Sequence, residues 1–395
     1  MRIAVVQVLA LAVWFSVSAV VPSLRQEWGI GAAEAVWLTG AVQVGFVVGA
    51  VGSAALTLAD RVRPHLLLAA CALAAAACTA VLAVAVDGMA GAVPLRFLTG
   101  VCLAGVYPVG MKLMASWSES ATRGRSLGIL VGALTVGSAL PHLLGGVGHL
   151  PWRGALAVAA GLGVVGAVVA VVSVRPGPHA AVGAPPRNPR YAVAMFGERG
   201  PRLVNLGYFG HMWELYALWT WLPAFLVAAG TGGAASEVLV FFALGVAGVA
   251  GCLLGGWASD RCGRSSAAVG ALAVSGACCL LSPIAFVAGP AALAVLCVVW
   301  GAAVIADSGV FSTVLSETAD QRYVGTALTA QTALGFTLTT VSIQLVPVFA
   351  GAVGWRYAFL LLAPGPLVGA VAMRLLRAGR PPSGVDGRFV RTASD

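Results

Sequence analysis

The sequence predicts an all-helical membrane protein whose twelve transmembrane helices form two related six-helix bundles. Three observations carry this prediction. First, 59% of the 395 residues are hydrophobic and only 9% are charged, whereas soluble domains carry about 25% charged residues. Second, the charges leave long uncharged stretches between them, and third, several motifs recur about 200 residues apart. A soluble enzyme is excluded because too little charge remains to cover its surface in water.

Uncharged segments mark the individual spans in order along the chain. Six of them are long enough to cross the roughly 30 Å hydrocarbon core as a helix, namely residues 3–24, 35–59, 66–86, 126–152, 154–174 and 238–259. The uncharged stretch 265–306 provides parts of two spans, because Ala288-Gly289-Pro290 near its middle predicts a turn. Four segments with isolated charges complete the twelve, namely 91–117, 201–228, 322–348 and 355–376. The first segment lacks a signal-peptide cleavage site, so we keep it as a span.

Basic residues predict the orientation of these spans. If the amino terminus is cytoplasmic, the cytoplasmic side holds 18 of the 23 Lys and Arg residues, and the outside holds only Arg25, Arg153 and Arg356. This bias is typical of cytoplasmic loops. We therefore expect a multi-pass protein of the cytoplasmic membrane, embedded in the lipid bilayer, with both termini inside. The net charge of +9 reflects topology, and no nucleic-acid partner is expected because the arginines are scattered over short loops.

Short motifs repeat between the two halves of the chain at offsets of 198 to 203 residues. The paired motifs are Val21-Pro22 with Leu222-Pro223, Ala59-Asp60-Arg61 with Ser259-Asp260-Arg261, Ser118-Glu119-Ser120-Ala121 with Ser316-Glu317-Thr318-Ala319, and Trp152-Arg153 with Trp355-Arg356. The repeat predicts bundles over residues 1–174 and 203–376, joined by a polar cytoplasmic linker over 175–202. We expect the tail, residues 377–395, to be disordered. Such a six-plus-six parallel repeat is typical of one large class of secondary transporters.

The loop between spans 8 and 9 carries the most specific motif. Its pattern Gly256-x-x-x-Asp260-Arg261-x-Gly263-Arg264 resembles the cytoplasmic loop signature of the major facilitator superfamily, and only Asp60-Arg61 remains of it in the first half. Glycine allows two helices to approach closely, and an Asp at a helix terminus can pair with an Arg across the bundle. We interpret the motif as a latch that holds one access state closed. A solvated turn at Asp60 and Arg61 is the alternative.

Spans 4 and 5 also resemble signatures of this superfamily. Span 4 contains Arg96-Phe97-x-x-Gly100 followed by Tyr107, and the resemblance implies a role for Arg96 in proton coupling or anion binding. Helical geometry places Tyr107 within about 20° of Arg96 and Gly100 about 40° away, and we interpret Gly100 as a point of close helix approach. Lys112 lies on the other side, where we expect it to extend to the cytoplasm. Span 5 is similar to the signature of proton-coupled antiporters, with Pro-His at His142 where that pattern has Gly-Pro. His142 is either a titrating group or a packing residue.

Span 7 contains the strongest candidate site residues. Glu214 lies past the middle of the bilayer, where a carboxylate costs several kcal/mol unless it faces a cavity, pairs or takes up a proton. His211 lies three residues earlier, so we expect it to pair with Glu214 and to make the proton affinity depend on the access state. Aromatic side chains, including Tyr216, surround the pair in sequence. They suit an amphipathic substrate, although Trp at span ends is also an ordinary interface anchor.

Two polar positions in spans 10 and 11 are further candidates. The energetic argument for Glu214 applies equally to Asp307, which is either a site residue or a structural partner of Lys112 or Arg322. Gln331 is a candidate ligand, and an interhelical hydrogen bond explains it equally well. The substrate- or proton-binding candidates are therefore Arg96, Tyr107, His142, His211, Glu214, Tyr216, Asp307 and Gln331. The candidates for the latch are Asp60, Arg61, Gly256, Asp260, Arg261, Gly263 and Arg264.

The resemblance implies a transporter that moves a small solute by alternating access. The loops look most similar to those of small organic or inorganic anion carriers of the nitrate and cyanate type, and we expect a monomer coupled to protons with no cofactor. Nitrate itself is disfavoured because spans 2 and 8 contain no Arg. The alternatives are a drug or metabolite antiporter that exports against protons, and a membrane sensor that does not transport. An enzyme is not expected, since the His and Cys spacings indicate neither a metal site nor a nucleophile beside a base.

Overall fold

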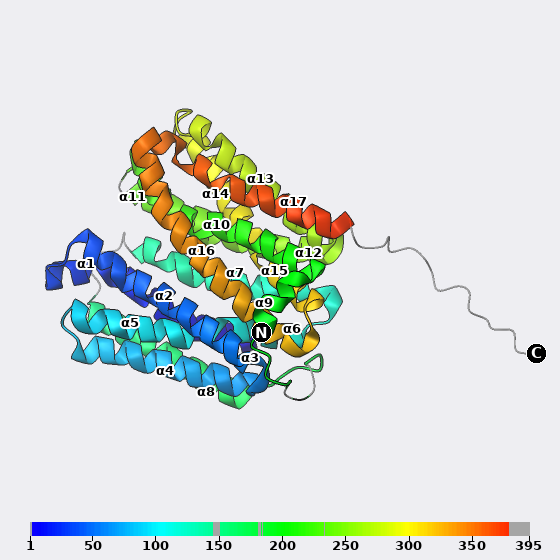
Figure 1. Cartoon of the computed structure of the whole chain (residues 1–395). Coiled ribbons are helices and arrows are strands. Elements are labelled where there is room, and N and C mark those ends of the chain that lie inside the picture. Colours follow the sequence, from blue (N-terminus) through cyan, green and yellow to red (C-terminus); the bar gives the residue numbers. More distant parts are fainter. Residues whose placement is uncertain (1, 145–150, 181–182, 184, 233, 379–395) are drawn as a thin grey trace, which may run out of the picture.

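The computed structural model describes residues 2–144, 151–180, 183, 185–232 and 234–378, and every regular element in these ranges is helical. The first half contains α1 (Arg2–Trp28), α2 (Ala32–Leu56), α3 (Leu58–Arg61), α4 (Pro64–Ala85), α5 (Met89–Leu103), α6 (Tyr107–Trp117), the 3₁₀ turn η1 (Ser120–Thr122), α7 (Arg123–Leu144) and α8 (Trp152–Ser173). Figure 1 shows these blue to cyan helices gathered on one side of the molecule. The expected disorder of the tail concerns residues that lie almost entirely outside the described ranges.

The second half follows a linker that contains α9 (Tyr191–Ala194) and the 3₁₀ turn η2 (Met195–Gly197). Its helices are α10 (Arg199–Ala228), α11 (Ala234–Val240), the π-helical segment η3 (Phe241–Ala247), α12 (Gly248–Cys262), α13 (Arg264–Ala285), α14 (Pro290–Ala306), α15 (Ser308–Thr318), the 3₁₀ turn η4 (Gln321–Tyr323), α16 (Val324–Val353), the 3₁₀ segment η5 (Trp355–Leu362) and α17 (Pro364–Ala378). The halves meet where α7 packs against α12 and α16 packs against α2.

The described helices confirm the twelve-helix membrane fold. Nine spans within the described residues are long and apolar enough to cross a bilayer, several of them built from consecutive elements such as α5 with α6 and α14 with α15. The other three are α1, α7 and α10, which have 27, 22 and 30 residues. Their lengths exceed the roughly 20 residues that a span needs. The start of α1 and the end of α17 lie toward the same end of the molecule (Figure 1), which we name the predicted cytoplasmic end.

Spans 4 and 10 are interrupted at corresponding places. The chain leaves the helix between Leu103 and Tyr107, with Pro108 in the first turn of α6, and it leaves the helix again at Asp307. The expectation that Arg96 and Tyr107 share one face of a continuous helix is therefore wrong. Broken helices near the midplane are a recurring feature of transporter binding sites, because they bring backbone polar groups and helix ends to the centre of the membrane.

Glycines set the close approach of neighbouring spans in the two halves. A Cβ added at Gly100 on α5 would meet the carbonyl oxygen of Val42 on α2, and one added at Gly301 on α14 would meet that of Ala243 in η3. The two positions differ by the repeat spacing. The interpretation of Gly100 as a point of close helix approach is thus confirmed. A side chain at Gly100 would therefore push α5 away from α2, and a side chain at Gly301 would push α14 away from η3.

Gly45→Ala on α2 is expected to destabilise the protein, whereas Gly52→Ala on the same helix is not. A Cβ at Gly45 would meet the carbonyl oxygen of Phe97, and a Cβ at Gly52 has nothing within 4 Å. Overpacking costs about 1–3 kcal/mol, while Ala in an open helical position gains about 0.5–1 kcal/mol over Gly. Thermal unfolding of the purified variants measures both effects. Equal melting temperatures for the two variants would contradict the packing that we describe.

Candidate transport site

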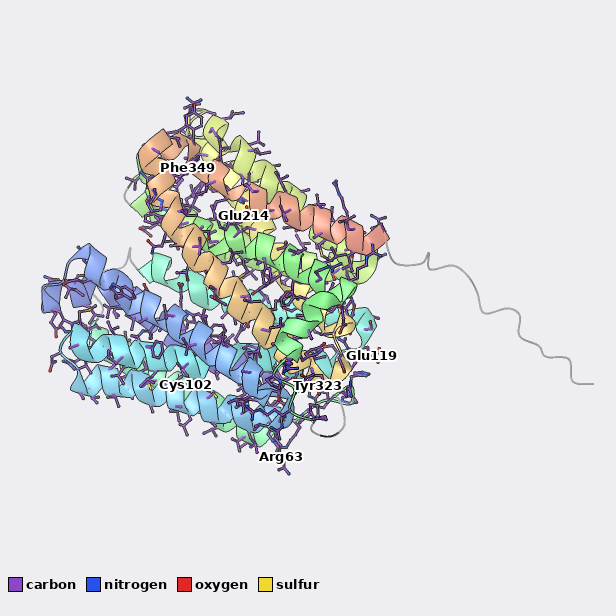
Figure 2. The ribbon with its side chains drawn as sticks, viewed as in Figure 1. Arg63, Cys102, Glu119, Glu214, Tyr323 and Phe349 are labelled. Atoms are coloured by element: carbon purple, nitrogen blue, oxygen red, sulfur yellow. The ribbon has the colours of Figure 1, made fainter. Side chains whose placement is uncertain are left out.

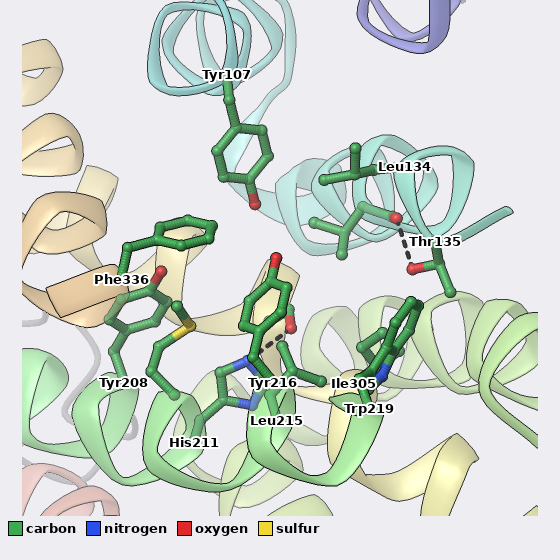
Figure 3. Close-up of a pocket in the computed structure, with 13 residues that line it drawn as sticks. Tyr107, Leu134, Thr135, Tyr208, His211, Leu215, Tyr216, Trp219, Ile305 and Phe336 are labelled. Carbon is green, nitrogen blue, oxygen red and sulfur yellow. Dashed lines mark hydrogen bonds between the residues drawn. The ribbon is translucent and has the colours of Figure 1, made fainter. Parts of the chain in front are cut away.

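A pocket with a cavity volume of about 40 Å³ lies between the two halves. The first half contributes residues of α6 and α7, including Tyr107 and Thr135. The second half contributes most of the polar and aromatic lining, which comes from α10, α14, α15 and α16 and includes His211, Tyr216 and Phe336 (Figure 3). Because both halves line it, the shape of this pocket changes whenever the halves move relative to one another.

His211 is the titratable group that connects this pocket to the broken span 10. Its Nδ1 lies 2.9 Å from Oδ1 of Asp307, and its Nε2 lies 2.9 Å from Oγ of Ser308. Asp307 is 1% exposed and His211 is 2% exposed, so neither charge can be compensated by bulk water. Together they form a buried pair that can hold a proton at the pocket wall.

Glu214 points away from this pair, so the expected contact between His211 and Glu214 is wrong. Its Oε1 accepts hydrogen bonds from Oγ of Ser275 at 2.5 Å, from Nε1 of Trp300 at 2.6 Å and from Sγ of Cys279 at 3.2 Å. These donors come from α13 and α14. Glu214 therefore lies inside the second half (Figure 2), behind the pocket rather than on its wall. A separation of three residues rotates two side chains by about 60° on a helix, which here is enough to direct them toward different neighbouring helices.

Arg96 also lies away from the pocket. Its guanidinium is 1% exposed and donates from Nε to the carbonyl of Leu38 at 3.1 Å, from Nη1 to Val13 at 2.9 Å and from Nη2 to Trp14 at 2.7 Å. These carbonyls belong to α1 and α2. The side chain thus ties three spans of the first half together through charge-assisted hydrogen bonds. Its predicted contact with a transported anion or proton has no counterpart in this geometry.

Aromatic side chains form the apolar part of the pocket wall. Tyr107 and Tyr216, both predicted, line it, and the ring centroid of Tyr216 lies 5.2 Å from that of Phe336. Phe336 in turn lies 4.8 Å from Phe46 and 5.4 Å from Trp14, both in the first half. Phe336 was not predicted, because an apolar residue in an apolar span carries no signal of its own. At this position aromatic rings of the two halves contact one another in tilted arrangements.

Gln331 and His142 are the two remaining residues predicted for the transport site. Gln331 on α16 is fully buried, and neither its Oε1 nor its Nε2 has a hydrogen-bond partner among the described residues. It does not line the pocket described above. His142 lies on α7, and its side chain is outside the described part of the chain. The roles predicted for both residues stay predictions.

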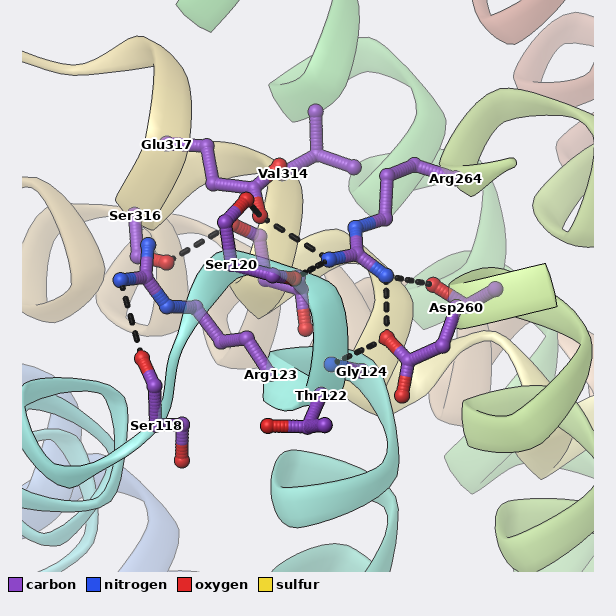
Figure 4. A network of polar contacts seen from close by, with 12 residues as sticks. Ser118, Ser120, Thr122, Arg123, Gly124, Asp260, Arg264, Val314, Ser316 and Glu317 are labelled. Carbon is purple, nitrogen blue, oxygen red and sulfur yellow. Dashed lines mark hydrogen bonds and ion pairs between the residues drawn. The ribbon is translucent and has the colours of Figure 1, made fainter.

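The loop motif of the second half closes the predicted cytoplasmic end (Figure 4). Asp260 accepts hydrogen bonds from the backbone N–H groups of Gly124 at 2.9 Å and Arg125 at 2.8 Å, which begin α7 in the other half. Arg264 pairs with Asp260 and also reaches Glu317 at 3.1 Å and the carbonyl of Ser120. The carboxylate is favoured here because the N-terminus of a helix carries partial positive charge. These contacts join the two halves at this end, and the role of the motif as a latch stays a prediction.

Two other members of the motif have local roles. A Cβ on Gly256 would lie 2.7 Å from the carbonyl oxygen of Gly124, so glycine permits α12 to approach α7. Gly263 has φ +91°, a left-handed conformation that favours glycine. Arg261 lies 5.8 Å from the ring centroid of Trp257 and is exposed, as is Arg61 in the first half. The cation of the latch is accordingly Arg264 rather than the Arg that directly follows Asp260.

The first half contains a matching latch with a different cation. Asp60 accepts hydrogen bonds from the backbone N–H of Gly325 at 2.8 Å and of Thr326 at 2.6 Å, and from Oγ1 of Thr326 at 2.7 Å, at the start of α16. Nζ of Lys112 lies 2.5 Å from Oδ1 of Asp60. The expectation that Lys112 extends freely to the cytoplasm is therefore wrong. The position that matches Arg264 is Pro64, so α6 supplies the cation that the loop lacks.

The suggested pairing of Asp307 with Lys112 or Arg322 is also wrong. Lys112 is held by Asp60, and Nη2 of Arg322 lies 2.7 Å from Oδ2 of Asp320 in the loop before α16. Hydrogen bonds from Arg322 lower the pKa of the Asp320 carboxyl. The partner of Asp307 is instead His211. Sequence spacing could not predict this pair, because the two residues lie on different spans.

Comparison with known proteins agrees with this architecture. The family model described as Major Facilitator Superfamily matches residues 3–343, and no curated protein sequence matches the chain. Among solved structures, the fold is similar to that of the human organic anion transporter MFSD10 (TETRAN), with 15% identity, 94% of this chain and 97% of that chain covered, and a TM-score of 0.74.

The fold is also similar to that of the E. coli fucose:proton symporter FucP, with 13% identity, 94% and 98% coverage and a TM-score of 0.70. A second structure of FucP, in the outward conformation, has 14% identity, the same coverage and a TM-score of 0.72. Identities this low show the fold alone. The family match over most of the chain, joined to twelve helices in two halves, shows that this protein belongs to the major facilitator superfamily of secondary transporters.

Proposed function

We propose that this protein moves a small organic anion together with a proton across the cytoplasmic membrane by alternating access. The observation that carries the proposal is the buried contact between His211 and Asp307 at the wall of the pocket that both halves line. In this proposal the solute binds in that pocket between the halves. The proton is held by the pair formed from α10 and the break in span 10.

The lining chemistry favours an organic anion over an inorganic one. Of the described residues around the pocket, His211 is the one whose side chain can carry a positive charge. Hydroxyl groups of Tyr107, Tyr216 and Ser308 provide neutral polar contacts, while Phe336 and its aliphatic neighbours favour an apolar body. A small amphipathic carboxylate satisfies both kinds of wall. An inorganic anion would leave the apolar wall without a partner.

Coupling follows from the mutual dependence of the two binding events. An anion beside His211 favours its imidazolium form, and the imidazolium in turn favours the anion, so proton and solute each raise the affinity for the other. Asp307 supports this coupling because it compensates the imidazolium charge when no solute is bound. Transfer of one proton with one monovalent anion moves no net charge across the membrane.

The names of two structural neighbours are compatible with this proposal. One is described as an organic anion transporter and the other as a fucose:proton symporter. In our proposal the latches at Asp60 and Asp260 hold the cytoplasmic gate closed, while the pocket exchanges solute with the outside. We further propose the predicted orientation with both termini cytoplasmic, bundle boundaries at residues 174 and 203, a monomeric protein and no cofactor besides the proton gradient.

Proteoliposomes that contain the purified protein and a trapped pH-sensitive dye test the proposal. The panel is lactate, mandelate and succinate as anions, fucose as a neutral solute and ethidium as a cation, each applied outside, with the signal of empty liposomes subtracted. A co-transported anion is expected to acidify the lumen. His211→Gln, which cannot become cationic, is expected to reduce this acidification to the level of empty liposomes, whereas Arg374→Gln on the surface of α17 is expected to leave it unchanged.

The sign of the proton flux separates the alternatives. Alkalinisation of the lumen by ethidium would instead identify an antiporter that exports drugs or metabolites. Acidification by an anion that His211→Gln leaves intact would overturn the assigned proton site while keeping the transport of anions. If none of the five solutes moves protons in the parent protein, the proposed organic-anion symport is contradicted.

A further inference from the structure

A second pocket lies at the seam of the two halves, at the predicted cytoplasmic end, and is distinct from the solute pocket. Its cavity volume is about 230 Å³. Its walls come from α6 and the start of α7 in the first half, and from α15, η4 and the start of α16 in the second half. Linker residues 178–180 form its remaining side. The pocket therefore exists in this shape only while the two halves are in contact.

Three basic side chains line this pocket, namely Lys112, Arg123 and His179. The Arg123 guanidinium donates from Nη2 to the carbonyl of Ser118 at 3.3 Å, and its Nε is buried without a hydrogen-bond partner among the described residues (Figure 4). Nζ of Lys112 donates to the carbonyl of Ala59 and to Asp60, which leaves one of its three N–H groups for a further acceptor. The pocket thus offers one buried donor without an acceptor, Nε of Arg123, and one further N–H of Lys112.

The acidic residues near this pocket are engaged elsewhere. Glu317 pairs with Arg264, and Asp60 is held by Lys112 and by the start of α16. No ion pair involves Arg123 within the described ranges. A buried N–H without an acceptor costs about 1–3 kcal/mol, so an acceptor supplied from solution would relieve this cost at Arg123.

The linker holds His179 at the mouth of the pocket. The backbone N–H of His179 donates to the carbonyl of Ser116 at 3.0 Å, and that of Gly177 donates to Oγ of Ser116 at 2.9 Å. The linker is therefore attached to the end of α6, beside the residues that carry Lys112. A ligand in the pocket would contact the first half, the second half and the linker at the same time.

We propose that this seam pocket binds a small oxyanion with phosphate or carboxylate chemistry, and that the bound ion stabilises the closed cytoplasmic gate. Arg123 provides a positive charge without an ion-pair partner among the described residues, together with the donor geometry that suits an oxyanion. Lys112 adds a further N–H donor, and His179 adds an imidazole at the mouth. Opening of the gate separates α6 and α7 from α15 and α16 and so divides the site. A ligand that binds only one state shifts the population toward it. Anions in the cytoplasm would therefore slow the opening of this gate.

Hydrogen exchange of the purified full-length protein in maltoside micelles tests this proposal without any transported solute. The readouts are the amides at the starts of α7 and α16, because Gly124, Arg125, Gly325 and Thr326 donate to the latch carboxylates only when the gate is closed. Inorganic phosphate is added at constant ionic strength against chloride, with acetate as the carboxylate probe. We expect saturable slowing of exchange by at least about threefold, a shift in the closed population of the kind that ligand linkage produces.

Matched variants make the outcome specific to this pocket. Arg123→Gln is expected to abolish the slowing, whereas Arg374→Gln, which changes an exposed arginine on α17, is expected to retain it. Slowing by short-chain phosphatidylglycerol but not by inorganic phosphate would assign the site to a lipid headgroup and overturn a soluble ligand. Equal exchange in phosphate and chloride, or equal slowing in Arg123→Gln, would overturn the proposal. Since no proton flux is measured, either result leaves the proposed symport to its own test.

Discussion

Asp307→Asn is expected to abolish solute accumulation driven by a pH gradient, down to the level of empty liposomes. Asn has nearly the same shape as Asp, so it fills the same space beside Nδ1 of His211, but it cannot compensate an imidazolium charge. A proton on His211 would then be an unpaired charge inside the membrane, which costs several kcal/mol. Exchange of solute at equal pH on both sides is expected to continue, because Asp307 is not itself among the residues that line the pocket.

Glu214→Gln is the matched control for this experiment. Gln retains an Oε1 that can accept the hydrogen bonds of Ser275 and Trp300, and Glu214 lies behind the pocket rather than on its wall. Accumulation of the labelled solute is expected to stay within about twofold of the parent, because conserving a hydrogen-bond acceptor avoids most of the cost of an unpaired donor. If Glu214→Gln loses the coupling and Asp307→Asn retains it, the proton is carried by Glu214 behind the pocket and our assignment is reversed.

Asp60→Asn is expected to have the largest effect on stability. The carboxylate is buried and accepts four hydrogen bonds, from Lys112, Gly325 and twice from Thr326. Removal of one partner from a buried ion pair costs about 3–5 kcal/mol because the other charge is left uncompensated. Both the melting temperature and the protection of the amides at the start of α16 should fall, since the same carboxylate caps that helix across the seam.

A double-variant cycle shows whether the pair itself is responsible. Lys112→Met removes the stranded charge, so the double variant Asp60→Asn with Lys112→Met is expected to lose less stability than the two single losses added together. Asp320→Asn is the control, because the pair of Asp320 with Arg322 is much more exposed and such pairs contribute about 0–1 kcal/mol. If Asp60→Asn lowers the stability no more than Asp320→Asn, the first-half latch does not hold the gate.

Much of the fold could be predicted because each signal depended on one stretch of sequence. Absence of charge over about 20 residues marks a span without reference to any other span. The repeat at Asp60 and Asp260 predicted that the halves would be built alike, and both residues do cap a helix of the opposite half. Gly100 was found for the same reason, since a small residue in an apolar span allows close packing whichever helix is adjacent.

The site was only partly predictable because its geometry depends on neighbours that come from other spans. Glu214 and His211 were recognised as costly residues inside a membrane, yet their pairing was inferred from spacing on one helix and was wrong. Ser275 and Trp300 donate hydrogen bonds to Glu214. Each is a polar residue in the middle of an uncharged span, so the sequence did contain a signal that pointed to them. For Phe336 no comparable signal existed, since only the approach of the two halves gives it a function.

The sequence by itself determined that this protein lies in a lipid bilayer, that its two halves are related by a repeat, and which ionisable residues lie inside the membrane. The cost of moving a charge from water into lipid belongs to the residue and its depth, so it can be read from one chain segment. Only the tertiary structure decided the partners of those charges, namely Asp307 for His211, Lys112 for Asp60 and three backbone carbonyls for Arg96. Pairing acts over a few ångströms between helices far apart in sequence, and their relative rotation, which no single span encodes, selects the contact.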